Sequence, residues 1–261
     1  MTSIRKPAFA GQFYSRNPGE LSSTVAALLE EAQEQDTPAP KALIVPHAGY
    51  SYSGPVAASA YARLRPYRDQ YRRVILVGPC HRTPIHGLAL SSVDVYRTPL
   101  GDVPLDKAAI ASLDFPNLRI SDKSHRTEHS LEVHLPFLQA VLGDFSIVPI
   151  VVGGAMPELV SQVLDALWGG PETLIVISSD LSHFRKYDDA RLIDAVTCKA
   201  IENLDAGRIS QEMACGSTPV AGLLIAAKRR KMEVTTLDLR NSADTAGDRG
   251  PVVGYGAWAF A

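Results

Sequence analysis

Apolar residues in this chain gather in short continuous runs, among them residues 43–45, 74–77, 174–177 and 234–239. Runs of this length between turn residues are typical of buried parallel strands. The carboxyl ends of such strands meet at one edge of an open α/β sheet, where ligands commonly bind. Each run is followed within six residues by a potential metal ligand or proton-transfer group: His47, His81, the pair Asp180 and His183, and Asp244. The pattern predicts a functional site at that edge.

Helical spacing of apolar residues appears between the runs, over residues 21–33, 129–142 and 157–168, and two or three helices are expected between residues 188 and 230. A further helix should open at Gly54-Pro55, because proline is favoured in the first turn. Additional strands are expected at residues 147–152 and 252–260, and residues 88–95 alternate enough for one that could be antiparallel. This order of elements predicts an α/β fold, with three layers, α/β/α, around a mixed, largely parallel sheet.

Composition and charge exclude several function classes. The chain has 261 residues, 46% of them hydrophobic, and no seam divides it, so residues 1–261 are expected to form one domain. Residues 35–40 are interpreted as a helix-to-strand connection.

The formal charge is −2 and the Lys and Arg residues are scattered, so the sequence has no basic cluster that would predict binding to nucleic acid or to an anionic membrane. Without a signal peptide or a span of ~20 apolar residues, the protein is expected to be cytoplasmic.

The three cysteines are too few and too unpatterned for a disulfide framework or a CxxC zinc site. We expect reduced thiols. Cys198 and Cys215 fall in segments interpreted as helical and are expected to be buried, behaving as small hydrophobes. Cys80, beside His81, is the one that we expect to be able to meet a metal.

His47, His81 and Asp244 supply a candidate metal site. Two neutral imidazoles and one carboxylate can hold Fe(II) on one face while leaving positions open for substrate and dioxygen. The two histidines are 34 residues apart, about one strand-helix-strand unit. Asp244 lies far along the chain and also fits an Asx-type turn with no metal. No local spacing such as HExxH ties the three together, so the alternative of polar loop residues stays open.

Asp180 and His183 place a carboxylate and an imidazole three residues apart at a strand end. They predict a catalytic pair in which His183 is a general acid or base and Asp180 orients it or binds substrate. In the alternative, Asp180 caps a turn and His183 is a structural donor.

A cluster of titratable residues crowds residues 125–134, namely His125, Glu128, His129, Glu132 and His134. It predicts a network, above all Glu128 and His129, that orients the metal-binding histidines. A solvated helix start is the alternative. Tyr50 and Cys80 could also line the pocket, although a tyrosine after a strand is as often a packing residue.

Several blocks of the sequence together resemble the Memo family, of the type called AmmeMemoRadiSam system protein B. They are Val45-Pro46-His47-Ala48-Gly49-Tyr50, Gly78-Pro79-Cys80-His81, Tyr96-Arg97-Thr98-Pro99-Leu100-Gly101, Glu128-His129-Ser130-Leu131-Glu132-Val133-His134-Leu135-Pro136, Ser178-Ser179-Asp180-Leu181-Ser182-His183, Asn241-Ser242-Ala243-Asp244 and Val252-Val253-Gly254-Tyr255. The resemblance implies the fold of class III extradiol dioxygenases, iron enzymes that open catechol rings. It also implies a metal pocket at His47, His81 and Asp244, with His183 as acid/base.

Three functions are compatible with these residues and this resemblance. The first is a mononuclear non-haem iron oxidoreductase acting on a small catechol-like or other aromatic substrate, with Fe(II) as cofactor. The second is a non-catalytic module that holds a metal, small molecule or peptide ligand, possible here because Cys80 leaves copper or zinc open. The third is a zinc-dependent hydrolase. The resemblance further implies a radical-SAM pathway partner, since bacterial relatives often accompany such a protein.

Overall fold

The computed structural model describes residues 2–32, 38–247 and 249–261. The helices are α1 (Pro18–Glu31), α2 (Tyr50–Tyr61), α3 (Lys107–Ala111), α4 (Asp122–Arg126), α5 (Leu135–Val141), α6 (Pro157–Ala166), α7 (Tyr187–Glu202), α8 (Ser217–Arg230) and α9 (Ser242–Thr245), with 3-10 turns η1 (Ala62–Tyr67), η2 (Glu132–His134) and η3 (Ala206–Arg208). The strands are β1 (Ile4–Arg5), β2 (Ala42–Val45), β3 (Arg73–Pro79), β4 (Leu88–Leu90), β5 (Val95–Thr98), β6 (Gly101–Pro104), β7 (Leu118–Ile120), β8 (Ser146–Val152), β9 (Thr173–Ser178), β10 (His183–Arg185), β11 (Val234–Asn241) and β12 (Val252–Phe260).

The main sheet has a parallel centre with antiparallel flanks. Its order is β10-β12-β2-β9-β3-β8-β4-β7, and β11 pairs with β12. The central strands β2, β9, β3 and β8 all run parallel. Their apolar residues are buried on both faces, as expected for parallel strands covered by helices. A small second sheet, β1-β5-β6, carries the N-terminal strand.

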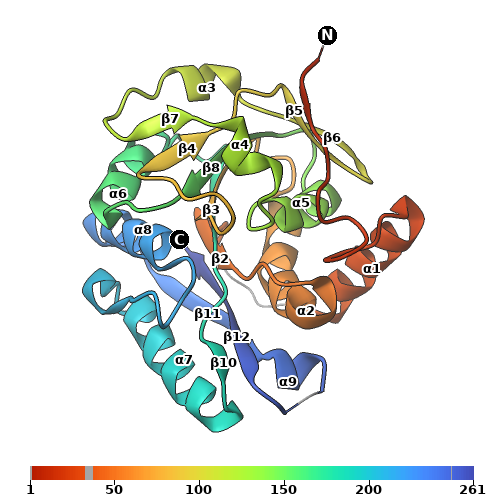
Figure 1. The fold of residues 1–261 in the computed structure, drawn as a ribbon, viewed down its shortest axis with the longest axis vertical. Coiled ribbons are helices and arrows are strands. Elements are labelled where there is room, and N and C mark those ends of the chain that lie inside the picture. Colours follow the sequence, from red (N-terminus) through yellow and green to blue (C-terminus); the bar gives the residue numbers. More distant parts are fainter. Residues whose placement is uncertain (1, 33–37, 248) are drawn as a thin grey trace.

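Helices cover both faces of the main sheet (Figure 1). On one face lie α6, α7 and α8, and on the other lie α1, α2 and α5. The predicted three-layer α/β/α fold around a mixed sheet is therefore confirmed. No helix in the described part of the chain is long and apolar enough to cross a membrane.

Three segments differ from the sequence predictions in detail, and a fourth cannot be fully compared. Helix α2 begins at Tyr50, so Pro55 lies inside it rather than at its start. Residues 88–95 divide into β4, which is antiparallel to β8, and the start of β5 in the small sheet. The predicted helix over residues 129–142 is shorter, because it opens with a 3-10 turn and Pro136 lies in the first turn of α5. The predicted connection at residues 35–40 falls partly outside the described residues.

The register of the central strands sets up the site. Val45 at the end of β2 pairs with Ser178 at the end of β9, and Val77 of β3 pairs with Ile177. Three parallel strands therefore end at the same level, and the loops that follow them emerge side by side. The fourth predicted strand behaves differently, because β11 is an antiparallel partner of β12 and half-buried rather than central.

Candidate metal centre

His47 follows β2 by two residues, and its ring is fixed from both sides. The Asp180 carboxylate accepts the backbone N–H of His47 at 2.7 Å. The Nδ1 atom of His47 lies 2.6 Å from Oγ of Ser178, whose own hydroxyl donates to the carbonyl of Ser130 at 2.6 Å. Because that hydroxyl proton is already used, Nδ1 must carry the proton and donate it. The lone pair of His47 is thus on Nε2.

His81 follows β3 and is oriented by the buried carboxylate of Glu128. That carboxylate accepts the backbone N–H of His81 at 2.6 Å and its Nδ1–H at 2.9 Å. It also accepts the backbone N–H groups of His129 and Ser130, each at 3.0 Å. Burial alone would raise the pKa of Glu128, but these bonds, the one from His81 first, lower it to about 2. Glu128 is therefore an anion that leaves Nε2 of His81 free as a ligand.

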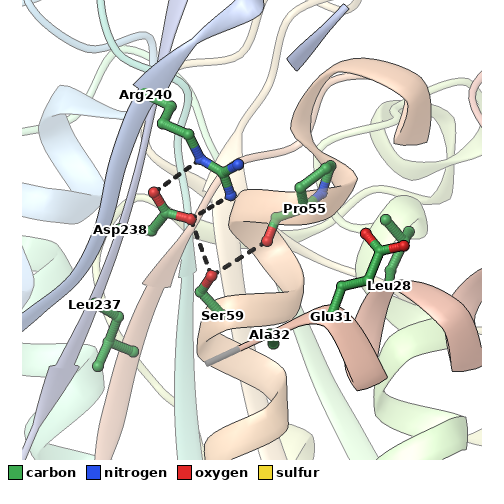
Figure 2. A pocket seen from close by; sticks show the side chains of 8 residues that line it. All are labelled: Leu28, Glu31, Ala32, Pro55, Ser59, Leu237, Asp238 and Arg240. Carbon is green, nitrogen blue, oxygen red and sulfur yellow. Dashed lines mark hydrogen bonds and ion pairs between the residues drawn. The ribbon is translucent and has the colours of Figure 1, made fainter. Parts of the chain in front are cut away.

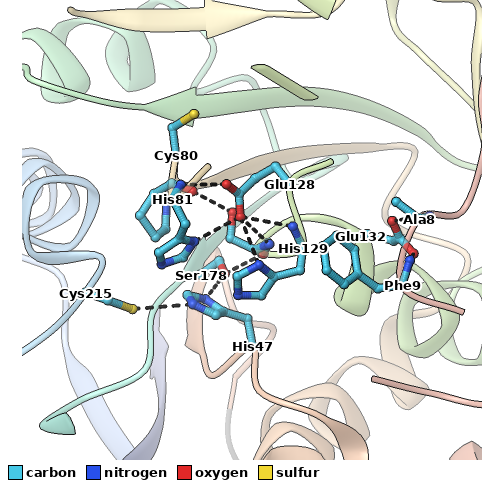
Figure 3. A network of polar contacts seen from close by, with 12 residues as sticks. Ala8, Phe9, His47, Cys80, His81, Glu128, His129, Glu132, Ser178 and Cys215 are labelled. Carbon is cyan, nitrogen blue, oxygen red and sulfur yellow. Dashed lines mark hydrogen bonds and ion pairs between the residues drawn. The ribbon is translucent and has the colours of Figure 1, made fainter. Parts of the chain in front are cut away.

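His129 completes a group with His47 and His81. One ligand atom from each of the three side chains lies within 4.8 Å of the others. The ring centroids are 5.2 Å apart for His47 and His81, 5.3 Å for His47 and His129, and 4.7 Å for His81 and His129 (Figure 3). Gly78 lets the His129 loop come this close, because a Cβ there would lie 3.0 Å from Oγ of Ser130.

Burial keeps two of these imidazoles neutral. It lowers the pKa of His47 well below its usual value, and the neighbouring His129 and His81 add to the effect. Burial likewise lowers the pKa of His129 to about 4, although the Glu128 carboxylate opposes the shift. Metal ions bind the neutral form of histidine, so these two rings are in the binding form at neutral pH.

The donor set fits a single metal ion. Nδ1 of His129 is buried and makes no hydrogen bond within the described residues, although it lies 3.3 Å from Glu128 in a geometry that forms none. The sulfur of Cys215 lies 3.4 Å from Nε2 of His47. A thiolate and an imidazole bound to one tetrahedral zinc would lie at a similar separation, ~3.5 Å. Cys215 is therefore a candidate additional ligand.

A cleft of about 830 Å³ opens beside the histidines. Its lining includes His81, His183, Arg185 and Cys215. The Nδ1–H of His183 donates to the carbonyl of Leu181 at 2.7 Å, since a carbonyl can only accept. This bond leaves Nε2 of His183 free to take or release a proton. The cleft is large enough for a small molecule.

Comparison with known proteins places the chain among Memo relatives. The model of the Memo-like protein family matches residues 5–259. The chain belongs to this family. A MEMO1 family protein of Methanosarcina barkeri is 35% identical over 97% of this chain and 98% of its own length. One from Sulfolobus acidocaldarius is 33% identical over 97% of both chains. Protein MEMO1 of Xenopus laevis is 34% identical over 85% of this chain and 84% of its own length.

One solved structure supports the fold alone. The crystal structure of an uncharacterized protein from Escherichia coli K12 superposes with a TM-score of 0.52 at 12% identity, covering 84% of this chain and 98% of that one. The Memo resemblance seen in the sequence is thus confirmed, together with the fold that it implies.

Asp244 of this Memo-like chain does not join the three histidines, which corrects the predicted ligand set. Its carboxylate accepts the N–H of Asn241 at 3.0 Å, in a capping box at α9, and the hydroxyl of Tyr187 at 2.7 Å. The cause is topological. Strand β12 separates β11 from β2, and β11 runs on to pair Asn241 with Gly254, whereas β2 ends near Trp258. His129 takes the predicted place of Asp244.

Of two further predicted pocket residues, Tyr50 has another role and Cys80 does line the cleft. The Tyr50 hydroxyl donates to the carbonyl of Val133 at 2.6 Å, and its ring packs on Phe137, so it is a core residue. Cys80 lines the cleft, but its thiol donates to the carbonyl of Thr83 and points away from the three rings (Figure 3). Cys215, which was predicted to lie in a helix, lies instead in a turn before α8, beside His47. Pro219 in the first turn of that helix was the available signal.

His125, Glu128, Glu132 and His134 are buried and His129 is half-buried, which excludes a solvated helix start for this cluster. Glu132 pairs with Arg5 and accepts the hydroxyl of Tyr14 at 2.5 Å. His134 contacts the hydroxyl of Tyr61 through Nδ1 at 2.8 Å, and His125 contacts Tyr96. Of this cluster, Glu128 and His129 belong to the metal centre, while the others tie the surrounding segments together.

Proposed function

We propose that this chain is a single-metal oxidoreductase in which His47, His81 and His129 bind the ion and Cys215 lies ready as a further ligand. One observation carries the proposal. Ser178 and Glu128 occupy the Nδ1 protons of His47 and His81, so that both rings keep Nε2 for a ligand. Such outer partners are typical of histidines that bind metal.

Imidazole ligands suit iron, copper and zinc alike. We propose Fe(II) for two reasons. The cleft beside the three histidines gives a small aromatic substrate access to the metal, and the Memo resemblance implies the fold of the extradiol dioxygenases, which use iron. A metal bound here would polarise substrate oxygens and, if iron, allow electron transfer to dioxygen.

The residues of the chain would bind substrate and move its proton. Nε2 of His183 is free and its ring is held by the carbonyl of Leu181, so it can accept a hydroxyl proton from a diol in the cleft. Asp180 acts indirectly, because its carboxylate already holds the backbone of His47. Burial raises the pKa of Asp180 to about 6, an effect that the bond from His47 opposes. Asp180 is thus a positioning residue in this proposal.

The test is anaerobic loading with Fe(II), followed by oxygen-uptake measurements across a panel of catechols. We expect uptake with at least one diol. His183→Ala should abolish it while iron stays bound, and Asp244→Asn should leave it unchanged. Stoichiometric iron with no uptake for any diol would end the dioxygenase proposal.

A zinc-dependent hydrolase is the second candidate, and the all-histidine group favours it. Three histidines with an open position are a known catalytic zinc set, in which the metal lowers the pKa of bound water. Ester hydrolysis by the zinc-loaded chain, without any reaction of the iron-loaded chain with oxygen, would select this alternative.

A further inference from the structure

A second hollow of about 570 Å³ lies between the N-terminal segment and helix α4, apart from the metal cleft. The two cavities share no lining residue. The apolar part of this hollow comes from Ile4, Pro7, Ala8 and Val93. Its volume falls in the range of small-molecule sites.

Three basic side chains that line the hollow have no partner among the residues that the structure describes. Lys6, Lys123 and Arg126 are exposed, and within the described residues none of them forms an ion pair or a hydrogen bond through its side chain. The acidic group of the lining, Asp122, is already held by the hydroxyls of Ser91 and Ser92 at 2.7 and 2.5 Å.

The positive charge of this hollow is opposite in sign to the net charge of the chain. The formal net charge is −2, so the cluster of cations does not follow from a generally basic surface. Exposed cations beside apolar surface attract an anion, and an ion pair there is strengthened when the bound molecule excludes water.

The cavity shown in Figure 2 provides a contrast. It measures about 360 Å³ and lies between α1, α2 and β11. Its Arg240 is already held by Asp238 at 3.0 and 2.5 Å, and Asp238 also accepts the hydroxyl of Ser59 at 2.9 Å. The cation that lines that cavity, Arg240, is paired with a carboxylate, whereas Lys6, Lys123 and Arg126 of the hollow beside α4 have no such pair within the described residues.

The walls of the hollow are held in place from behind. Arg5, on the N-terminal wall, donates to the carbonyls of His125 at 3.1 Å and Glu128 at 2.7 Å, next to the opposite wall. Arg5 also pairs with Glu132, which accepts the backbone N–H of Ala8 at 2.9 Å. A preformed hollow loses less conformational entropy when a ligand binds.

We propose that this hollow is a binding site for a small molecule with an anionic group on an apolar body. Lys6, Lys123 and Arg126 would pair with the carboxylate or phosphate of that molecule. Ile4, Pro7, Ala8 and Val93 would cover its apolar part. The site is separate from the metal centre and does not depend on the function proposed for it.

The test compares two probes that share one apolar body and differ in charge, 4-phenylbutyrate and 4-phenylbutan-1-ol. Each is titrated into the full chain by calorimetry and by NMR of the backbone amides. We expect the carboxylate to bind about tenfold more tightly than the alcohol or better, since hydrogen bonds to charged groups contribute that much. The largest changes in backbone amide chemical shift should occur at Ala8 and Thr127.

The variant Lys123→Gln/Arg126→Gln should lose most of the preference for the carboxylate. The matched control is Lys228→Gln/Lys231→Gln, which removes two exposed cations at the end of α8 and should keep it. All four positions are exposed, so neither variant should unfold the chain. Equal affinity for both probes, no binding of either, or an unchanged preference in the Lys123/Arg126 variant would overturn the proposal.

Discussion

At the scale of single residues, the chemistry of this site is set by what lies behind each histidine ring. His47 and His81 have the same side chain, yet one is oriented by a neutral hydroxyl and the other by a carboxylate. A carboxylate makes the ring that it holds a stronger donor to a metal. His47 and His81 should therefore differ in how strongly they bind a metal. Metal affinity should depend more on the partner of His81 than on the partner of His47.

Replacing Glu128 by Gln should weaken metal binding by about 10 to 100-fold, because the amide keeps the shape but loses the charge that orients His81. Competition titration with a coloured chelator measures the change. Asp244→Asn is the control and should leave affinity unchanged, because Asp244 caps α9. A loss at Asp244 equal to that at Glu128 would restore the ligand set predicted from sequence.

His125 gives a prediction on pH. Burial lowers its pKa to about 4, against the opposing effect of its bond to the Ala89 carbonyl. The unfolded chain takes up this proton near pH 6.5, so the stability that neutral His125 contributes is complete above that pH and is lost as pH falls toward 4. The loss expected from His125 alone between pH 7 and 5 is about 2 kcal/mol in the free energy of unfolding, and His47, His129 and His134, whose pKa values burial also lowers, add losses of their own.

The difference between the unmodified chain and His125→Gln in urea unfolding at the two pH values isolates this loss, and NMR of labelled histidine follows the ring itself. A His125 resonance that titrates near pH 6.5 in the folded chain would contradict the prediction.

At the scale of elements, the parallel strands could be predicted and the loops could not. Residues 43–45, 74–77 and 174–177 form central strands because continuous apolar runs suit a sheet covered on both faces. The strands predicted from these runs therefore already indicated that His47 and His81 lie close together. The pairing of β11 depends on β12, which lies later in the chain, so the position of Asp244 could not be read locally. Cys215 was missed for a similar reason, since only folding brings it to His47.

Gly254 in β12 is a point where two elements meet closely. A Cβ at this position would lie 1.9 Å from Oδ2 of Asp194 in α7. The other oxygen of that carboxylate, Oδ1, accepts the backbone N–H of Ser182 at 3.1 Å. Gly254→Ala should therefore lower stability by roughly 1 to 3 kcal/mol through overpacking. Gly207→Ala is the control, because its nearest neighbour would be 3.7 Å away. Urea unfolding of both variants measures the difference, and an equal effect would argue against overpacking.

At the scale of the whole molecule, a metal ion would join segments that are distant in sequence. His47, His81 and His129 follow β2, β3 and α4 in turn. Binding to the folded chain alone therefore stabilises the packing of all three.

We expect Zn²⁺, used as a redox-inactive probe, to stabilise the fold by about 2.7 kcal/mol at a free concentration 100 times its Kd. Thermal unfolding with and without chelator measures this. His47→Ala should abolish the effect, and a Zn²⁺-dependent rise in Tm that survives in that variant would place the metal elsewhere.

The pairing of Arg5 with Glu132 has a consequence for how the protein tolerates proteolysis. Chain ends can usually be trimmed at little cost. Here, a cut after Phe9 would remove the guanidinium and the amides of Ala8 and Phe9 that satisfy a fully buried carboxylate. An unpaired buried charge costs about 3 to 5 kcal/mol, a large part of the stability of a typical domain. Proteolytic removal of these few residues should therefore destabilise the entire chain and lead to its degradation.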